Sequence, residues 1–553
     1  MKTKNPTVGR KLYSRYGRVF GERLVYLRKD CNFADCNKGL RMLYPIGVQN
    51  FEDLRQNGYV YVDKTRLIHR LVKTGKYYFL SRPRRFGKSL LVSTLESYFR
   101  GKKHLFEGLA MEQLESDWKE YPVLHFDLNA KKFDTEEDLY DLVGRQLERY
   151  ESQYDTTAVD KSLDGRFYNL LMTIAEKTGN KVVVLIDEYD KPLLQAIGNP
   201  ELQNTYRNIL KAFYGVIKSC GGQIHFAFLT GVTKFGKVSV FSDLNNLNDI
   251  SMDHQYYDIC GISDDELFGY FDESIRELAA HNGQTYQEAC DRLKADYDGY
   301  HFCEDIPGMY NPFSILNTFY KNRYGYYWFE TGTPTYLVEL LMNSDFPLDQ
   351  IDGYKTSKDI LNGIDPESPI AVIYQSGYLT FKDYDEEFDL VTVGFPNREV
   401  EKGFLLFLLP FYTSLKKEQP NYFVSKCVQA LKRGDAEEFM RNMQTLFAGY
   451  PYDLIKNTES HYQNVVYLTL KLMSVYVVDG EYRTSNGRID LLIKTDKYIY
   501  VMEFKYDGSA QEAMDQIESK EYSLPFEADG REIIKVGVNF SSIARNIENW
   551  IIK

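Results

Sequence analysis

One stretch of this sequence has the residue types of a phosphate-binding loop. SRPRRFGKSL at 81–90 contains Gly87, Lys88 and Ser89, the last three positions of the pattern G-x-x-x-x-G-K-[ST], and it has Arg82 in place of the first glycine. In such a loop the backbone N–H groups surround phosphate, the lysine reaches the terminal phosphates and the hydroxyl holds magnesium. The lysine and the hydroxyl are both present, so the stretch predicts a phosphate loop without the glycine that eases its tight turn.

A second stretch, VVVLIDEYD at 182–190, ends an apolar run in the adjacent acids Asp187 and Glu188. Neighbouring carboxylates at the end of a buried strand repel each other unless a cation lies nearby. In phosphate-loop ATPases the first acid supports magnesium and the second orients the attacking water. We therefore predict ATP and Mg²⁺ as cofactors, Asp187 and Ser89 as metal ligands, and Glu188 as a catalytic residue.

Other candidates for the nucleotide site also have a purely structural interpretation. Thr230 ends the strand IHFAFLT, where it can sense the terminal phosphate or simply cap a turn. Arg82, Arg84 and Arg85 could contact phosphate, since a guanidinium matches phosphate oxygens, or a neighbouring subunit of a homo-oligomer. The predicted cofactor-binding residues are Arg82, Pro83, Arg84, Arg85, Phe86, Gly87, Lys88, Ser89, Asp187 and Thr230.

A separate set of charged residues lies near the C-terminus. Glu503 and Lys505 are two apart on the apolar strand YIYVMEFKY, so they share a face. Asp490 starts the preceding strand IDLLI, and a hairpin around 495–497 would bring it beside Glu503. Two carboxylates next to a lysine can hold a magnesium ion that activates water against a phosphodiester. We predict Asp490 and Glu503 as metal ligands and, with Lys505, as catalytic residues.

Two further residues extend this second site. Glu481 matches an acid that such sites place on their first strand, and it is a third candidate metal ligand. Gln516, on the following helix, can contact the metal-bound water or the nucleic-acid backbone, or it can lie on a solvated helix face. Residues 458–553 hold eleven basic and fifteen acidic residues, a net charge of −4, which leaves room for a domain that only binds.

The elements that must position these residues follow from hydrophobic periodicity. The strand at 76–80, the loop at 81–87 and the helix at 88–100 form the context that a phosphate loop requires. Apolar strands at 123–128, 182–187 and 224–231 alternate with helical stretches, a pattern that predicts a parallel sheet with both faces covered.

The chain between about 300 and 420 is rich in Tyr, Phe and Gly. A helix end followed by two strands around an acidic turn predicts a winged-helix-like module. Winged helices bind DNA or serve as lids on ATPases, and the acidic residues along this hairpin favour the lid. They are Asp383, Glu386, Glu387 and Asp389.

Composition places the chain among ordinary soluble proteins, with 43% hydrophobic and 26% charged residues and no run long enough for a membrane span. Seven scattered cysteines suit free thiols in the cytoplasm. The net charge of −12 argues against bulk electrostatic coating of nucleic acid. We divide the chain into a basic extension (1–43, net charge +8), an ATPase-like domain (44–300), a lid or winged-helix-like region (301–420) and a helical lead-in with the C-terminal domain (421–553).

Several motifs together resemble one known family. YPIGVQNFEDLRQNGYVYVDKT, SRPRRFGKS, VVVLIDEYDKP, LTGVTKF and YWFETGTPTYL occur in the order found in the bacterial AAA-ATPase-like family with a C-terminal PD-(D/E)XK nuclease domain. The resemblance runs from about residue 44 to the end. It implies an α/β chain: a P-loop NTPase parallel sheet, a helical middle region and a restriction-endonuclease-like α/β/α domain. Arg82 is the family's own variant, and the resemblance assigns the same roles to Asp490, Glu503, Lys505 and Gln516.

The resulting hypothesis is an ATP-binding protein, an ATPase, that controls a magnesium-dependent nuclease. DNA is favoured over RNA by analogy with relatives. The alternative is a nucleotide-dependent regulatory or scaffolding protein whose nuclease-like domain only binds a partner. An enzyme acting with ATP on a small molecule has no second substrate motif in its favour.

Overall fold

The computed structural model describes most of the chain from Met42 onward. The described residues are 42–157, 160–234, 246–330, 335–344, 346–363, 369–413, 415–416, 419–448, 458–479, 482–484, 487–544 and 546–553. The basic extension predicted for 1–43 therefore lies, apart from its last two residues, outside the described residues.

Five parallel strands form the sheet of the N-terminal half, in the order β2-β3-β4-β1-β5. They are β1 (Tyr77–Ser81), β2 (Val123–Asp127), β3 (Val182–Asp187), β4 (Ile224–Gly231) and β5 (Asn248–Asp249). Every side chain of β3 is buried, as expected of a central parallel strand. The predicted parallel sheet is confirmed. Because β4 lies between β1 and β3, the ends of these three strands meet at one edge.

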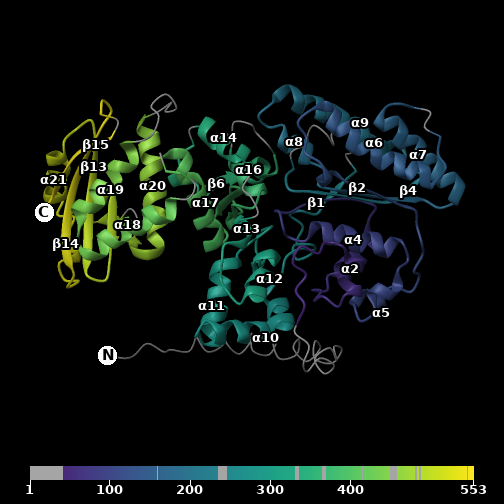
Figure 1. Ribbon diagram of the computed structural model, residues 1–553, viewed down its shortest axis with the longest axis horizontal. Helices are drawn as coiled ribbons and strands as arrows, with labels where there is room; N and C mark the ends of the chain where they lie inside the picture. The colour runs from purple at the N-terminus through teal and green to yellow at the C-terminus, as the bar shows by residue number, and fades with distance from the viewer. Residues whose placement is uncertain are drawn as a thin grey trace.

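Helices cover both faces of this sheet, which is why the central strands β3 and β4 are largely apolar and buried (Figure 1). On one face are α2 (Phe51–Gln56), α4 (Lys88–Phe99) and α5 (Ala110–Leu114), with α3 (Thr65–Thr74) packed on α5. On the other are α6 (Glu136–Gln153), α7 (Leu163–Thr178), α8 (Lys191–Gln195) and α9 (Pro200–Ser219).

Three helices follow the sheet and form a small core of their own. They are α10 (Asp264–His281), α11 (Tyr286–Tyr297) and α12 (Pro312–Lys321). Ser263 and Thr285 begin α10 and α11 with capping boxes, in which side chain and backbone satisfy each other's hydrogen bonds. The short helix α13 (Tyr327–Glu330) leads from this core into the middle region.

The middle region contains the element order of a winged helix. Its elements are α14 (Thr335–Asn343), β6 (Tyr354–Ser357), α15 (Lys358–Asn362), α16 (Pro369–Gln375), β7 (Thr380–Asp385) and β8 (Leu390–Gly394), with sheet order β6-β8-β7. The predicted hairpin with its acidic turn is β7–β8. The sequence did not predict β6, because its four residues, YKTS, show no clear alternation.

The helix α16 occupies the place of a DNA-reading helix but is not available to DNA. Ile370, Ala371 and Ile373 are fully buried, and the Gln375 side chain accepts a hydrogen bond from the backbone N–H of Lys234 at 2.7 Å. The helix packs on α14 and α15 of the same region, and its last residue, Gln375, is hydrogen-bonded to Lys234 of the ATPase-like domain. Together with the acidic hairpin, this burial favours the lid over a DNA-binding winged helix.

The C-terminal part is a three-layer α/β/α unit, as predicted. Its sheet has the order β15-β14-β13-β12-β9, in which only β13 and β14 run parallel. The strands are β9 (Val478–Asp479), β12 (Leu491–Lys494), β13 (Tyr498–Tyr506), β14 (Glu532–Ser541) and β15 (Asn546–Ile552); β10 (Tyr482–Thr484) and β11 (Gly487–Ile489) pair separately. One face carries α21 (Ala510–Ser519), and the other faces α18 (Pro420–Arg433), α19 (Ala436–Ala448) and α20 (Thr458–Val477).

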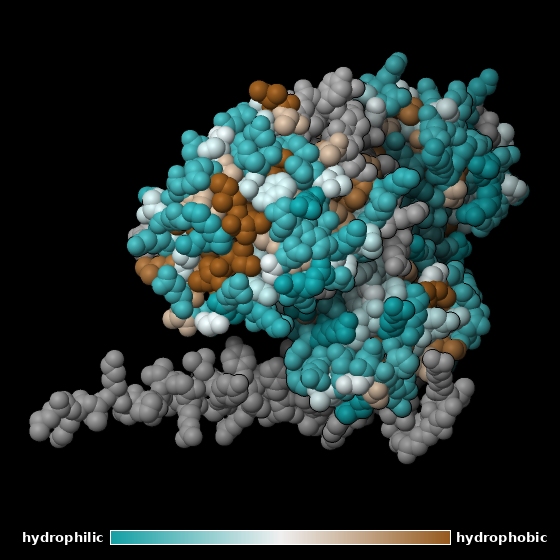
Figure 2. Space-filling view, turned by 60° about the vertical axis from the view of Figure 1, so that its left-hand side comes forward, coloured by the Kyte–Doolittle hydropathy of each residue, from teal (hydrophilic) through white to brown (hydrophobic). Residues whose placement is uncertain are grey.

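The two halves of the molecule lie at opposite ends of its long axis, with the middle region and α17 (Arg398–Tyr412) between them (Figure 1). Figure 2 brings the C-terminal end forward and shows hydrophilic residues over most of that surface, with one hydrophobic patch among them. Of the helices in the described part of the chain, none combines the length and apolar character needed to cross a membrane.

The close packing of α21 on the sheet depends on Gly537 in β14. A Cβ atom there would lie 2.5 Å from the carbonyl oxygen of Ala510 and 2.8 Å from the backbone nitrogen of Met514. We expect Gly537→Ala to lower the free energy of unfolding of the C-terminal unit by about 2 kcal/mol, because backbone must move. Chemical denaturation monitored by circular dichroism measures this change.

The matched control is Gly269→Ala in α10, where an added Cβ meets no atom within 4 Å. Because Gly269 is exposed and helical, and alanine favours the helix, this substitution should raise the free energy of unfolding by about 0.5–1 kcal/mol. Equal effects of the two substitutions would contradict the packing argument.

Candidate functional site

The phosphate loop lies between β1 and α4. Gly87 precedes the helix with φ 96° and no side-chain cap, so the first N–H groups of α4 are left for another acceptor. Arg85 also has a left-handed backbone, with φ 65°. A left-handed residue followed by a helix N-terminus forms an anion-binding concavity of backbone N–H groups.

Lys88 is almost fully buried, at 3% exposure, inside this loop. Its Nζ donates to the carbonyl oxygens of Arg82 and Pro83 at 3.2 and 3.3 Å, and lies 3.3 Å from Oε1 of Glu188. The structure thus brings the predicted lysine and the predicted catalytic acid together, although 100 residues separate them. Glu188 has φ 54°, a strained backbone for a residue other than glycine, and such strain is found where surrounding contacts enforce it.

Asp187 ends β3 next to the start of α4. Oδ1 of its carboxylate is buried without a partner, and the Ser89 side chain lies near enough to lower the pKa of this carboxyl. Burial first, and then the charge of Glu188, raise the pKa of Asp187 to about 6. A buried, unpaired carboxylate oxygen beside a serine hydroxyl fits Mg²⁺, which takes few protein ligands and completes its shell with phosphate and water.

Thr230 is placed where the sequence predicted, at the end of β4 between β1 and β3. Its hydroxyl is fully buried and donates to the carbonyl oxygen of Leu80 at 2.9 Å. This contact ties the two strands together without any nucleotide, so it supports the structural interpretation that the sequence left open.

Asp190 is a residue of this site that sequence reasoning missed. It is fully buried and accepts hydrogen bonds from Val232 N and from Thr233 N and Oγ1, at 3.2, 2.6 and 2.6 Å. Burial and the charge of Glu188 raise its pKa to about 6. The third acid of the stretch DEYD was the available signal, and its role is to hold the ends of β3 and β4 in register.

A cleft with apolar walls adjoins the phosphate loop. It is lined largely by apolar side chains and has a volume of about 620 Å³ when its open mouth is included. Lys64 is the one charged residue among its described lining residues, and both carboxylate oxygens of Glu266 lie 2.6 Å from its Nζ. The walls include Val60, Val62, Ile68, Phe86, Ile262 and Leu316. The sequence did not predict this cleft, because its walls come from segments more than 200 residues apart.

The side chains of Arg82, Arg85 and Phe86 contact residues outside the phosphate loop. Arg82 is buried and donates to backbone carbonyls of the segment 251–257, so its predicted contact with phosphate finds no support in this geometry. The Arg85 guanidinium lies 5.1 Å from the ring centre of Phe313. Phe86 forms part of the cleft wall.

Two contacts join the loop backbone to the middle region. The Trp328 indole donates to the carbonyl oxygen of Arg84 at 2.9 Å. A Cβ at Gly377 would lie 2.5 Å from Pro83 Cβ, so only glycine permits the present approach.

The second site lies at the C-terminal end of β13. Asp490 falls between β11 and β12 rather than inside a strand, and its Oδ2 accepts a hydrogen bond from the Phe504 N–H at 3.0 Å. Because Leu491 pairs with Met502, Asp490 lies opposite Glu503. The hairpin predicted around 495–497 is confirmed.

Lys505 and Gln516 complete the second cluster. Lys505 Nζ lies 3.6 Å from Oε1 of Glu503. The Gln516 side chain, from α21, donates to that same oxygen and accepts from Lys505. Four of the five residues predicted for this site are therefore together, and the fifth, Glu481, lies outside the described residues.

Glu503 has the environment of a cation ligand. Its side chain is buried and Oε2 has no hydrogen-bond partner. Burial first, and then the charge of Asp490, raise its pKa from 4.5 to about 7. Mg²⁺ fits here as well, since a cation between the two carboxylates removes their repulsion. No group of three or more His, Cys, Asp or Glu placed to hold a metal occurs within the described ranges, so both sites need oxygen ligands from elsewhere.

This pKa makes a test of metal binding possible. Below about pH 7 a metal must displace the proton from Glu503, so the apparent Mg²⁺ affinity should fall up to about tenfold per pH unit there and be flat above it. Calorimetric titration with Mg²⁺ at pH 6, in two buffers of different ionisation heat and without nucleotide, counts the released protons. Affinity that stays constant from pH 6 to pH 8 would contradict the assignment.

These features define the class of protein. A parallel sheet of order β2-β3-β4-β1-β5 with Lys88 and Ser89 facing the acids of β3 is the arrangement of a P-loop ATPase-type domain. A mixed sheet carrying an aspartate, a glutamate and a lysine at one strand end is the arrangement of a PD-(D/E)XK-type domain.

Comparison with known proteins gives the family. A family model described as predicted AAA-ATPase matches residues 45–241, and the PD-(D/E)XK nuclease superfamily model matches residues 457–550. A protein of Azotobacter chroococcum mcd 1, described as an uncharacterized protein in the vnfD 5′ region, is 32% identical over 530 residues, which cover 93% of this chain and 99% of the relative. The chain belongs to the AAA-ATPase-like family with a C-terminal PD-(D/E)XK domain, and the predicted membership is confirmed.

Proposed function

We propose that the chain binds ATP with Mg²⁺, hydrolyses it, and uses the nucleotide to control a magnesium-dependent phosphodiesterase that acts on nucleic acid. The observation that carries the proposal is the meeting of Lys88 and Ser89 with Asp187 and Glu188 beside an apolar cleft. The cleft accepts a base, the helix N-terminus and Lys88 accept phosphates, and the buried acids balance a metal ion.

The roles of the nucleotide-site residues follow from this geometry. Lys88 leaves the carbonyls of Arg82 and Pro83 for the terminal phosphates. Ser89 and Asp187 hold Mg²⁺, which neutralises phosphate charge when bound. Glu188, whose carboxylate lies beside the Lys88 amine, orients the water that attacks the terminal phosphate. Thr230 senses the terminal phosphate only if its hydroxyl is released from Leu80.

In the C-terminal site, Asp490 and Glu503 hold the metal ion, which activates water when bound. Lys505 orients that water or stabilises the developing negative charge, and Gln516 positions the lysine through its side-chain oxygen. Glu481 is an additional ligand in this proposal. The preference for DNA over RNA rests on the family resemblance alone.

The competing function is a nucleotide-dependent scaffold, and one observation favours it. The segment 458–553 carries a net charge of −4, whereas strands of nucleic acid are held mainly through phosphate contacts to basic residues. In this alternative the C-terminal unit binds a partner and cleaves nothing.

One experiment separates the two functions. Purified protein is incubated with supercoiled plasmid and Mg²⁺, with ATP, with a non-hydrolysable ATP analogue, and without nucleotide, and released phosphate is measured in parallel. Mg²⁺-dependent nicking that differs between nucleotide states supports the proposal. ATP hydrolysis without nicking in any state supports the scaffold.

The proposal also includes a cytoplasmic location and a homo-oligomer. The described cysteines are free thiols, which fit the reducing cytoplasm. In this proposal Arg84 or Arg85 contacts a second copy of the chain, and light scattering with and without ATP tests for a homo-oligomer.

A further inference from the structure

Arg82 stands where a conventional phosphate loop has its first glycine, and its side chain points away from the nucleotide site. It is 1% exposed, and its guanidinium donates to the carbonyl oxygens of Ser251 at 2.7 Å and Tyr256 at 3.3 Å. The same group lies 4.0 Å from the ring centre of Phe302. The described residues supply no carboxylate within ion-pairing distance of it.

A buried charge with only neutral partners is unusual. Arginine is rarely fully buried unless it is paired, because desolvation of the charge is costly. The carbonyl oxygens and the face of Phe302 partly compensate, but Nε has no partner and burial lowers the pKa of Arg82. A glycine at this position would avoid the whole penalty, so the contacts of Arg82 must serve the arrangement of the loop.

The contact with Phe302 connects the loop to the region 301–420, whereas Ser251 and Tyr256 belong to the ATPase-like domain itself. Phe302 packs edge-on against Phe86, with ring centres 5.4 Å apart, and Phe86 immediately precedes Gly87 and Lys88. Lys88 Nζ in turn donates to the backbone carbonyl of Arg82. A movement of Lys88 toward phosphate therefore breaks a hydrogen bond to the very residue that ties the loop to Phe302.

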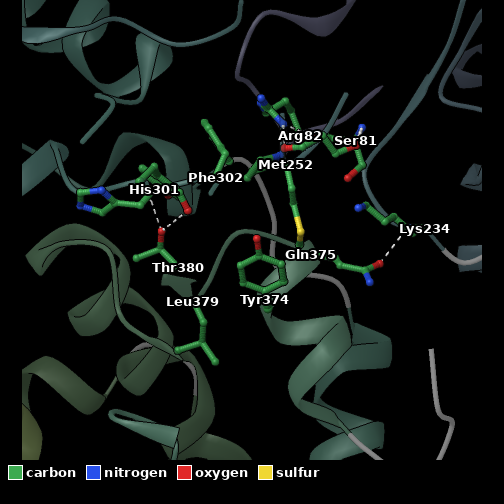
Figure 3. A pocket seen from close by; sticks show the side chains of 13 residues that line it. Ser81, Arg82, Lys234, Met252, His301, Phe302, Tyr374, Gln375, Leu379 and Thr380 are labelled. Atoms are coloured by element: carbon green, nitrogen blue, oxygen red, sulfur yellow. Dashed lines mark hydrogen bonds between the residues drawn. The ribbon is translucent and has the colours of Figure 1, made fainter. Parts of the chain in front are cut away.

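Space for such a movement lies next to Arg82. A small cavity, with about 30 Å³ open to a water-sized sphere, lies between the loop and the middle region, and Figure 3 shows Arg82, Phe302, Lys234 and Tyr374 around it. Densely packed interiors resist rearrangement, so even a small cavity gives the side chains that line it some freedom to shift.

The contacts continue toward the C-terminal half. Trp328 donates its indole N–H to the loop carbonyl of Arg84, and its backbone N–H to Glu399 at the start of α17 at 2.8 Å. Along α17, Glu401 pairs with Lys471 of α20 at 3.0 Å, and α20 leads directly into β9 of the C-terminal sheet. A series of contacts thus runs from the phosphate loop to the sheet that carries the second site.

We propose that Arg82 is a positioning residue that passes the nucleotide state of the phosphate loop to the middle region, and that it is not a phosphate ligand. This inference rests on the proposed binding of ATP by the same loop. A glycine at position 82, as in the conventional pattern, would therefore uncouple the middle region from the nucleotide state rather than improve the nucleotide site.

The test uses Trp328 as a reporter in the full-length chain. Trp118→Phe and Trp550→Phe leave Trp328 as the single tryptophan, and its emission is recorded with and without Mg-ATP. In this background Arg82→Gly and Arg82→Lys are compared with the unchanged loop. Arg145→Lys, at an exposed arginine on α6 paired with Asp141, is the matched control.

In the background protein, Mg-ATP should shift the emission of Trp328, since its indole bond to the loop changes. We expect Arg82→Gly to abolish this shift and to lower kcat for ATP about tenfold, while KM stays within about threefold. Arg82→Lys keeps the charge but neither the planar stack on Phe302 nor the fork of donors, so its shift should be reduced rather than restored. A purely structural role would instead change folding and all constants together.

Other outcomes decide against the inference. If Arg82→Gly binds ATP more tightly, or if its Trp328 shift equals that of the background protein, Arg82 is not the coupling residue. Should Arg82→Gly fail to fold, Phe302→Leu removes the ring under the guanidinium and must give the same loss of shift. If the background protein itself neither binds ATP nor responds, the proposed function fails and the inference falls with it, whereas a normal response in both Arg82 variants sinks the inference alone.

Discussion

Lys88→Ala should reduce ATP hydrolysis about a hundredfold or more, because the substitution removes the cation that the proposed mechanism places at the terminal phosphates. The lysine is in place before nucleotide binds, held by two loop carbonyls and by Glu188. Its loss therefore affects both the binding of ATP and the stabilisation of charge in the transition state. Phosphate release and fluorescent-nucleotide binding measure the two effects separately.

The controls for this substitution must account for Glu188, the partly buried partner of Lys88. Removing Lys88 leaves Glu188 without its cation, so Lys88→Met, which retains most of the side-chain volume, should be tested beside the alanine variant. Lys102→Ala, at a partly exposed lysine paired with Glu52, should leave hydrolysis unchanged. Unaltered ATP affinity in both Lys88 variants would rule out this loop as the nucleotide site.

The second large effect is expected at the carboxylates of the C-terminal site. Asp490→Asn and Glu503→Gln should each reduce plasmid nicking about a thousandfold, since each removes a charged ligand of the metal ion that activates water. Nicking that persists at the wild-type rate in both variants would come from a contaminant, and the proposed nuclease would be withdrawn.

Stability distinguishes a catalytic Glu503 from a structural one. Its folded-state pKa of about 7 lies above the ordinary value of 4.5, so the native state is destabilised as pH rises from about 4.5 through 7. Glu503→Gln removes that charge, and at pH 8 without metal it should stabilise the C-terminal unit by about 1–3 kcal/mol. At pH 4.5 and below the gain should disappear.

Thermal unfolding of wild type and Glu503→Gln at pH 8 and pH 4.5 tests whether the substitution stabilises the C-terminal unit only at the higher pH. A variant that is inactive yet more stable at pH 8 is the signature of a functional carboxylate held in an unfavourable environment. A variant that is inactive and less stable at both values would indicate that Glu503 mainly supports the fold.

The middle region gives these two sites a common partner. Its winged-helix element order and its acidic hairpin allowed two interpretations, and the burial of α16, with Gln375 hydrogen-bonded to Lys234, favours the lid over a DNA-binding winged helix. The same region touches the phosphate loop through Trp328 and Gly377 and the C-terminal half through α17. In the proposed function, ATP could therefore control the second site through a change in this region, without a large rearrangement of the sheet.

The sequence by itself determined the local features of both sites. Strand, loop and helix around Lys88 and the buried strand ending in Asp187 follow from hydrophobic periodicity, as does the strand that carries Glu503 and Lys505. Their boundaries at β3 and β13 agree with the structure residue for residue. The placement of Asp490 opposite Glu503 also followed, because a short hairpin leaves little choice of register.

Only the tertiary structure decided what the loop residues contact. Arg82 lies 169 residues before Ser251, and Arg84 lies 244 residues before Trp328, yet each pair shares a hydrogen bond. The walls of the cleft beside Gly87 and the contacts that bury α16 also come from residues that are distant in the sequence. Periodicity reports which face of an element is buried but not which distant element buries it, because that choice depends on packing across the whole chain.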